Sequence, residues 1–438
     1  MNHIAIFLAR IARGLSRLRG GGGSALPGLI VEKLRPNFLK EILGSLPRGV
    51  VVISGTNGKT TTTKITAELL RGAGLKVFTN PTGSNFVRGV ISAILSKLKR
   101  GRLDADIAVL ELDEAHAALF VKQIRPSYAL ILNVARDQLD RFGEIDTTAK
   151  LLEKVAASTT RGVILNWDDP RVLKIAANLP TDLEIQTFGY APSLTNIFPA
   201  DDDLYNDEKS EPKKSAKLQK NSVDSREKFR RKFPSVELEN YQPGRAEFAI
   251  GGKIYHADLR LNGAHNALNA AAALALVRQI LAGNFDAEKI VKLLNEIRPA
   301  FGRGEKISIG GQHLQLILVK NPGGFRSALM SQYDKNSSVM LAINDAYADG
   351  RDVSWLWDVD FSRVKNVAAV GGTRAFDMAL RLQYDNVKFG RVETDLVKLL
   401  NYFLKENPDW PKQIFCTYTA MLKIRAELKK IARLEPIE

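Results

Sequence analysis

The chain has 438 residues, of which 45% are apolar, and a formal net charge of +15. This length exceeds the roughly 100–200 residues of a typical domain, so we expect two or three domains, each with its own core. No apolar run reaches the roughly 18–20 residues of a membrane-spanning helix, which argues against a transmembrane protein. The basic excess predicts an anionic partner or substrate. The single cysteine, Cys416, excludes an intramolecular disulfide and a multi-cysteine metal site, as suits a reducing cytoplasm.

The first residues predict a short basic amphipathic helix. Apolar side chains within 4–18 recur at helical spacing, and Arg10, Arg13 and Arg17 lie between them. The apolar stretch is too short for a secretory signal, and a glycine-rich linker follows at 20–24. Two alternatives stay open, a helix packed on the first domain, which we prefer, and a helix lying on an anionic membrane surface.

From Val50 to about Pro180, short apolar runs alternate with helical stretches. This alternation predicts a parallel sheet covered by helices on both faces, and therefore the α/β class. The candidate strands are 50–53, 107–110, 128–132 and 163–165. A charged insertion without cysteine follows at about 190–240, and 18 of its 32 residues between 201 and 232 are charged, which predicts a solvated loop. A mixed β segment and an alanine-rich helix at 264–281 come next.

A second series of strands and helices begins near Leu314. Its candidate strands are 316–319, 339–343, 367–370 and 414–415. We therefore divide the chain into an N-terminal basic helix and linker (1–48), a central domain (49–302) and a smaller, Rossmann-like α/β domain (303–438).

Residues 54–61 predict a phosphate-binding loop, because they follow a strand, open a helix and read Ser-Gly-Thr-Asn-Gly-Lys-Thr-Thr. The glycines allow the backbone to wrap round the phosphates, and the amides of the helix N-terminus supply donors. Lys59 is expected to neutralise the β and γ phosphates during catalysis, and the Thr60 hydroxyl to bind Mg²⁺. The first glycine of the full motif is replaced by Ile53. The predicted nucleotide-binding residues are Gly55, Thr56, Asn57, Gly58, Lys59, Thr60 and Thr61.

The metal also needs a carboxylate, usually at the end of a neighbouring strand. Glu111 is the first choice and Glu114 the second, and a solvated acidic turn is the alternative. Residues 113–116 read Asp-Glu-Ala-His, which is a helicase box, so a nucleic-acid motor is one candidate function. The second motor domain and the arginine-rich late motifs of a helicase are missing, and we expect no nucleic-acid partner.

Five motifs in order resemble the Mur ligase and folylpolyglutamate synthase superfamily. They are the loop at 55–61, Arg136–Gly143, Asn166–Pro170, Gly263–Ala271 and Gly302–Glu305. The resemblance implies an ATP-dependent ligase with a central P-loop domain. It also implies that Asn266 and Asn269 reach the adenine, and that Arg303 reaches the nucleotide when the C-terminal domain closes.

The C-terminal part resembles one branch of this superfamily. Lys320-Asn321-Pro322 stands where amino-acid-adding ligases usually carry His-Asn-Pro, and residues 343–358 and 371–375 resemble the MurT family, the synthetase subunits of lipid II isoglutaminyl synthase. The resemblance implies amidation of the α-carboxylate of D-glutamate in lipid II through an acyl phosphate, in the cytoplasm or at the inner membrane face. The zinc ribbon common in this family lacks its four cysteines here, so we expect no zinc.

The resemblance further implies a separate GatD-like glutaminase that supplies ammonia within a heterodimer. We expect Cys416 to be a buried core thiol and not a nucleophile. In the family an aspartate of the synthetase completes the triad of the glutaminase; Asp352 is the first choice and Asp349 the second. Alternatively, Asp352 caps the helix that begins near Ser354. A stand-alone ligase that adds an amino acid to a carboxylate is the alternative function, and Lys320 and the two aspartates argue against it.

Overall fold

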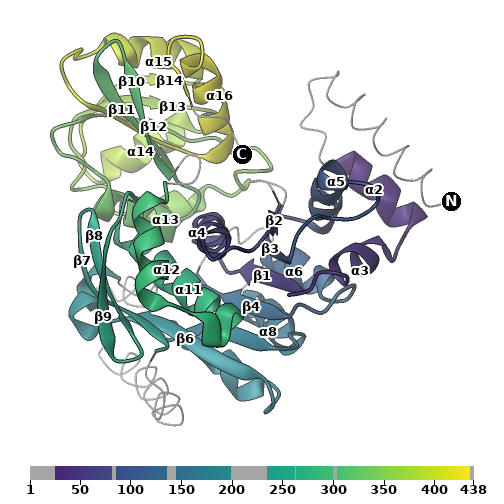
Figure 1. The fold of residues 1–438 in the computed structure, drawn as a ribbon. Helices are drawn as coiled ribbons and strands as arrows, with labels where there is room; N and C mark the ends of the chain where they lie inside the picture. The colour runs from purple at the N-terminus through teal and green to yellow at the C-terminus, as the bar shows by residue number, and fades with distance from the viewer. Residues whose placement is uncertain are drawn as a thin grey trace. The chain divides into compact units, whose positions relative to one another are not determined.

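The computed structural model describes residues 25–80, 85–135, 145–198, 234–261, 263–298 and 303–434. Within these residues the chain forms two compact units, one of residues 25–134 and 145–298 and one of Ala135 and residues 303–434 (Figure 1). Both have a mostly parallel sheet covered by helices, which confirms the predicted α/β class. The predicted helix at 4–18, the segment 136–143 and the charged run 201–232 lie outside the described residues.

The first unit contains a nine-stranded sheet in the order β2-β3-β1-β4-β5-β6-β7-β8-β9. The strands are β1 (Val50–Ser54), β2 (Val77–Thr79), β3 (Ile107–Glu111), β4 (Tyr128–Ile131), β5 (Gly162–Asn166), β6 (Glu184–Tyr190), β7 (Val236–Gln242), β8 (Arg245–Ile250) and β9 (Lys253–Asp258). The first seven run parallel, and β8 and β9 form an antiparallel edge. Because β1 lies between β3 and β4, the loops that follow these three strands meet at one edge of the sheet.

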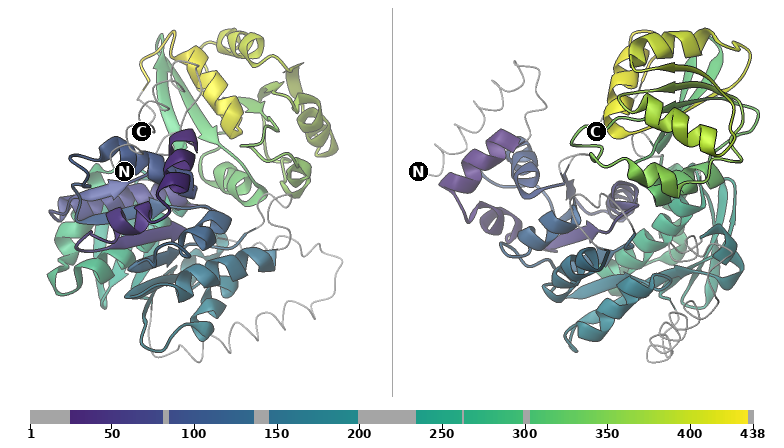
Figure 2. Two further views of the ribbon diagram at one scale, coloured as in Figure 1. Left: turned by 90° about the vertical axis from the view of Figure 1, so that its right-hand side faces the viewer. Right: turned by 180° about the vertical axis from the view of Figure 1, so that it is seen from behind.

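Helices cover both faces of this sheet (Figure 2). They are α2 (Ala25–Leu34), α3 (Phe38–Leu43), α4 (Lys59–Gly72), α5 (Val87–Lys97), α6 (Glu114–Phe120), α8 (Ile145–Ala157), α9 (Pro170–Ile175), α11 (Ala264–Leu281) and α12 (Ala287–Leu293). Side chains of a strand point alternately to the two faces. Val51 and Ile53 of β1 therefore pack with α4 and α11, whereas Val50 and Val52 pack with α3, α5 and α6. This burial on both faces explains why β1 is apolar throughout.

The second unit contains a six-stranded sheet in the order β10-β11-β15-β12-β13-β14, parallel except for the β10–β11 pair. Its elements are β10 (Arg303–Ile309), β11 (Gln312–Leu318), α13 (Pro322–Ser331), β12 (Ser338–Ala342), the 3₁₀ helix η6 (Ser354–Asp358), β13 (Val367–Gly371), α14 (Ala375–Tyr384), β14 (Phe389–Glu393), α15 (Leu396–Lys405), β15 (Lys412–Cys416) and α16 (Tyr418–Leu428). One face packs against α13, η6 and α14, and the other against α15 and α16.

Three features differ from the sequence predictions. Residues 25–43, expected within a linker, form α2 and α3, and their apolar side chains are buried in the core of the first unit. The expected insertion at 190–240 contains regular structure at both ends, the 3₁₀ helix η2 (Pro192–Ile197) and the start of β7. The strands β2, β6, β10 and β14 were not predicted, because their sequences are short or mix charged with apolar residues.

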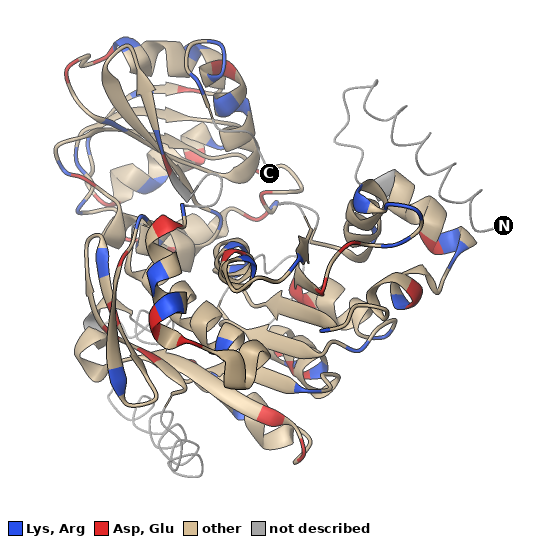
Figure 3. Ribbon diagram, in the orientation of Figure 1, with Lys and Arg blue, Asp and Glu red and all other residues tan. Residues whose placement is uncertain are grey.

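Basic and acidic residues are interspersed along the described elements of the ribbon in Figure 3. In the described part of the chain, no helix combines the length and the apolar character that crossing a bilayer requires.

Candidate active site

The loop between β1 and α4 needs glycine at two positions. Gly55 has a φ of +131° and Gly58 a φ of +88°, both in the range that favours glycine. A Cβ atom on Gly58 would lie 2.4 Å from Asn269 Oδ1, and one on Gly55 would lie 2.9 Å from the Asn133 backbone nitrogen. The helix α4 begins at Lys59, so its first amides extend the row of donors in the loop. The turn therefore has the left-handed glycines and the helix N-terminus that a phosphate-binding loop requires.

Asn133, which follows β4, holds this loop in place. Its side chain accepts a hydrogen bond from the Asn57 amide at 2.8 Å and donates one to the Asn57 carbonyl at 3.0 Å. Its own carbonyl accepts a hydrogen bond from the Thr56 amide at 3.0 Å. Asn133 was not predicted from the sequence, because it lies far from the loop along the chain and becomes its neighbour through the pairing of β1 with β4.

Lys59 is buried at the start of α4. Its Nζ donates hydrogen bonds to the carbonyls of Gly55 and Thr56 and lies 3.5 Å from Glu114 Oε1. Glu114, the second choice for the metal carboxylate, is the first residue of α6 and is also buried. The structure thus pairs Glu114 with Lys59, and the helicase-like letters at 113–116 form the start of a short helix.

Glu111, the first choice for the metal carboxylate, is the last residue of β3. Its Oε1 accepts a hydrogen bond from the Thr60 hydroxyl at 2.9 Å. The Asn80 side chain fixes the Glu111 backbone, accepting from its amide at 3.0 Å and donating to its carbonyl at 2.9 Å. Hydroxyl and carboxylate oxygens are ligands that Mg²⁺ prefers.

These two residues fit a magnesium ion that is also bound by phosphate. Among the described residues, no group of three histidine, cysteine, aspartate or glutamate side chains is placed to hold a metal. Mg²⁺ usually takes one or two protein ligands and completes its shell with waters and phosphate oxygens. A Thr60–Glu111 pair beside a phosphate loop matches that pattern.

The Asn166–Pro170 motif joins the ends of three strands. Asn166 donates to the Leu132 carbonyl at 2.8 Å, and Asp168 accepts from the Tyr190 amide at 2.8 Å. Asp169 accepts from the Val134 amide at 2.7 Å and caps the first turn of α9. Burial raises the pKa of the Asp169 carboxyl. The motif therefore supports the loop after β4, which carries Asn133.

The second turn of α11 brings Asn269 to the loop between β1 and α4. Asn269 lies against Gly58, and its Nδ2 is 3.5 Å from Asn266 Oδ1. His265 is partly buried and contacts the edge of Phe198, with 5.1 Å between ring centroids. Burial lowers the pKa of His265 to about 4, so the imidazole is neutral near pH 7. Arg303 begins β10, and its side chain lies outside the described part of the structure.

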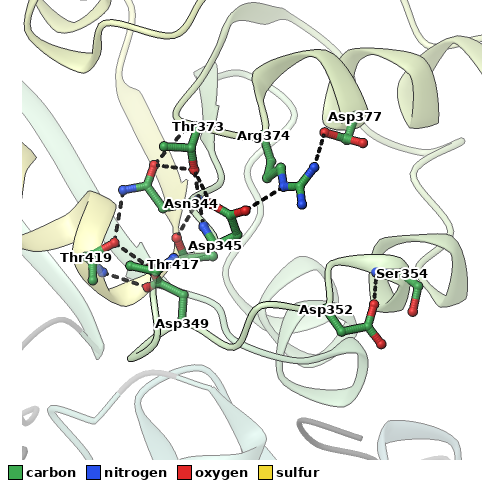
Figure 4. Close-up of polar contacts among 11 residues, drawn as sticks. Asn344, Asp345, Asp349, Asp352, Ser354, Thr373, Arg374, Asp377, Thr417 and Thr419 are labelled. Atoms are coloured by element: carbon green, nitrogen blue, oxygen red, sulfur yellow. Dashed lines mark hydrogen bonds and ion pairs between the residues drawn. The ribbon is translucent and has the colours of Figure 1, made fainter. Parts of the chain in front are cut away.

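In the second unit, Asp349 belongs to a buried polar network at the ends of β12 and β15 (Figure 4). Its Oδ1 accepts a hydrogen bond from the Thr419 amide at 2.8 Å, and its Oδ2 accepts from the Thr419 hydroxyl and from the Ala346 amide at 3.1 Å. The Asn344 side chain donates to the same hydroxyl at 3.0 Å. The network holds the loop 344–350 against α16.

Asp352 lies apart from this network and is only partly buried (Figure 4). Its Oδ1 accepts a hydrogen bond from the Ser354 amide at 2.8 Å, at the start of η6. Its Oδ2 has no hydrogen-bond partner among the residues that the structure describes. Asp352 therefore caps the start of η6 through Oδ1, as the alternative prediction had it, and its Oδ2 is available to another group.

Two further side chains bear on the predictions for this unit. Asp345 accepts hydrogen bonds from the Thr373 hydroxyl and from Arg374, both at 2.8 Å, and the first of these contributes most to lowering its pKa. Cys416 is fully buried at the end of β15, and burial raises the pKa of its thiol. The prediction of a core thiol is thereby confirmed.

Comparisons with known sequences match both parts of the chain. The Mur ligase middle domain family matches residues 53–277, and the MurT ligase C-terminal family matches residues 318–421. The MurT subunit of the glutamine-hydrolyzing lipid II isoglutaminyl synthase of Streptococcus pneumoniae is 33% identical, with 96% of each chain covered. The corresponding subunit of Staphylococcus aureus (strain COL) is 29% identical, with 90% of each chain covered.

Comparisons with solved structures find the same architecture. MurF from Acinetobacter baumannii has a TM-score of 0.65 and 18% identity, over 92% of this chain and 81% of that one. Folylpolyglutamate synthase from Mycobacterium tuberculosis has a TM-score of 0.63 and 14% identity, over 94% of this chain and 99% of that one. At these identities the likeness shows the fold alone.

Proposed function

The chain belongs to the MurT family of lipid II isoglutaminyl synthase subunits, and from this membership we propose how its residues divide the work of an ATP-dependent amide ligase. The reaction belongs to peptidoglycan synthesis. It converts the α-carboxylate of D-glutamate in the lipid II stem peptide into the amide of D-isoglutamine. The observation that carries the assignment of residues is the phosphate loop with Lys59 and the Thr60–Glu111 pair at its helix end.

Amide formation from a carboxylate requires activation, because oxide is a poor leaving group. Transfer of the γ-phosphoryl group of ATP to the carboxylate gives an acyl phosphate and ADP. Ammonia then attacks the acyl carbon, inorganic phosphate leaves, and the nitrogen loses a proton. Positive charge and oriented donors are what the first step needs, since two anions must approach each other.

The loop residues supply those donors. The amides of residues 55–60 surround the phosphates, and Lys59 Nζ offsets charge on the β and γ phosphates. Thr60 and Glu111 would hold Mg²⁺, which when bound neutralises further phosphate charge. Asn269, beside Gly58, and Asn266 are placed to orient the adenine nucleotide from α11. Arg303 is proposed to contribute a further positive charge from the start of the C-terminal unit.

Ammonia comes from a partner. The relatives named above are subunits of a glutamine-hydrolyzing enzyme, and Cys416 is too deeply buried to act as the nucleophile. We assign glutamine hydrolysis to a GatD-like glutaminase that forms a heterodimer with this chain. Asp352 would orient the histidine of that glutaminase, and the Oδ2 atom without a partner supports this choice. Asp349 is the alternative, although both of its oxygens already accept hydrogen bonds.

Two variants test the assignment. Lys59→Ala should abolish ATP hydrolysis and amidation with either nitrogen source, and acyl-phosphate formation in this variant would contradict the assignment of the loop. Asp352→Asn keeps the side-chain oxygen that accepts from Ser354, so the start of η6 should persist. It should amidate lipid II normally with ammonium salts and lose amidation with glutamine. Equal loss with both sources would remove Asp352 from the triad, and Asp349→Asn is then the variant to test.

A further inference from the structure

The helix α14 carries an exposed apolar stripe. Phe376 is 69% exposed, Leu380 48% and Tyr384 68%. These residues stand four positions apart, so their side chains lie along one face of the helix. The opposite face is buried, and its Met378 and Leu382 belong to the core of the second unit. The helix is therefore held in the fold by its other face, and the exposed stripe is not needed for that packing.

The 3₁₀ helix η6 extends this stripe. Trp357 is 49% exposed, and its ring meets that of Tyr384 edge to face, with 5.0 Å between centroids. Arg381 lies beneath, 5.4 Å from the Trp357 ring, and donates to the Leu356 carbonyl at 3.2 Å and the Val359 carbonyl at 2.7 Å. These bonds fix α14 and η6 together. Trp357, Phe376, Leu380 and Tyr384 are called the aromatic face below.

The composition of the aromatic face is that of an interface centre. Single apolar residues on a surface are ordinary, but a connected group of large ones marks a place where another molecule binds. Tryptophan and tyrosine are enriched among residues that dominate binding energy, usually within a polar rim. Polar groups flank the stripe near the start of α14, where Arg374 pairs with Asp345.

The position of the aromatic face indicates its occupant. Asp352 Oδ1 bonds to the amide of Ser354, the first residue of η6, and Trp357 lies three residues further on. A protein whose histidine contacts the segment 349–352 must lie over the start of η6. Because η6 and α14 are fixed together, the same protein can extend over Trp357 and the stripe. We propose that the aromatic face is the docking surface for the glutaminase subunit, an inference that rests on the function proposed above.

The test measures binding between the full chain and the purified glutaminase subunit from the same organism. Leu380→Lys places a charge in the centre of the aromatic face without entering the core. The matched control is Met330→Lys, which replaces a 58% exposed apolar residue on α13 of the same unit. Leu380→Lys should raise the Kd by about tenfold or more. Met330→Lys should change the Kd by less than about twofold.

Four measurements separate the possible outcomes: amidation from ammonium salts, binding to the glutaminase, amidation from glutamine, and sedimentation of the chain alone. Both variants should retain wild-type amidation from ammonium salts, which reports that they fold. If wild-type chain binds the glutaminase and Leu380→Lys binds it equally well, the docking surface is wrong and the proposed function stands. If the wild-type chain neither binds the glutaminase nor uses glutamine, the proposed function is wrong, and the docking surface that rests on it is wrong as well. Sedimentation of the chain alone tests for a second copy, because a dimer that Leu380→Lys dissociates would assign the aromatic face to self-association and overturn the proposal.

Discussion

Adding one methyl group at Gly58 should damage the phosphate loop in two separable ways. The residue has a φ of +88°, which side-chain-bearing residues rarely adopt. The new Cβ would also lie 2.4 Å from Asn269 Oδ1 and 3.1 Å from its Cγ, well inside van der Waals contact. Gly58→Ala therefore combines backbone strain with a collision against α11.

Gly74 allows the two effects to be separated. It has a φ of +92°, and a Cβ there would meet no atom within 4 Å. Gly74→Ala should reduce the free energy of unfolding by about 1–2 kcal/mol, the usual penalty of a left-handed backbone. A collision in a packed site adds about 1–3 kcal/mol. Gly58→Ala should therefore reduce it by about 2–5 kcal/mol.

Differential scanning calorimetry can follow the transition that ATP with magnesium shifts upward, since a ligand stabilises the unit that binds it. Shortening the Asn269 side chain tests whether its collision with the new Cβ causes the additional loss of stability. In a double-mutant cycle, Asn269→Ala should restore about 1–3 kcal/mol of the loss in Gly58→Ala and none of the loss in Gly74→Ala. The reasoning is refuted if Gly58→Ala is no more harmful than Gly74→Ala, or if Asn269→Ala brings no relief.

Two further predictions concern the same unit. Asn133→Ala removes two hydrogen bonds to Asn57, each worth about 1 kcal/mol, so the Kd for ATP should rise about ten- to thirtyfold in titration calorimetry. The exposed Asn178→Ala is its control, and equal affinities for the two variants would contradict the bracing role. His265 has a pKa lowered to about 4 by burial, so the unfolded chain binds a proton near pH 5 that the folded chain does not. Stability should fall by about 2 kcal/mol from pH 7 to pH 5 on this account, and His265→Gln, unlike the exposed His256→Gln, should remove that loss.

The strand, turn and helix that form the proposed phosphate loop could be predicted because their determinants are local. The strand, the two glycines, the lysine and the helix lie within residues 50–72, and each has a preference that a short window of sequence displays. The helix 264–281 was predicted with the bounds of α11, since its small apolar residues are buried on nearly every side. Where one local rule dictates structure, the sequence suffices.

The partners of the loop could not be predicted in that way. Asn133 and Asn269 reach it through strand order and helix packing, which connect residues distant along the chain. Edge strands such as β10 and β14 are partly exposed, so their sequences lack the continuous apolar run that indicates a strand. The exposed stripe on α14 was likewise not predicted, because Phe376, Leu380 and Tyr384 have the spacing of an ordinary buried helix face.

Glu111, the last residue of β3, and Glu114 differ by three positions in the sequence, and this difference decides their roles. Glu111 ends a strand whose register places it beside the last residues of β1, so its carboxylate meets Thr60 at the start of α4. Glu114 begins a helix and turns toward the ammonium group of Lys59. A buried cation is unfavourable without a nearby negative charge. The fold thus places one carboxylate beside the Lys59 ammonium group and the other beside the Thr60 hydroxyl, so charge compensation of Lys59 leaves free the Glu111 oxygen that we propose as a ligand of a phosphate-bound magnesium ion.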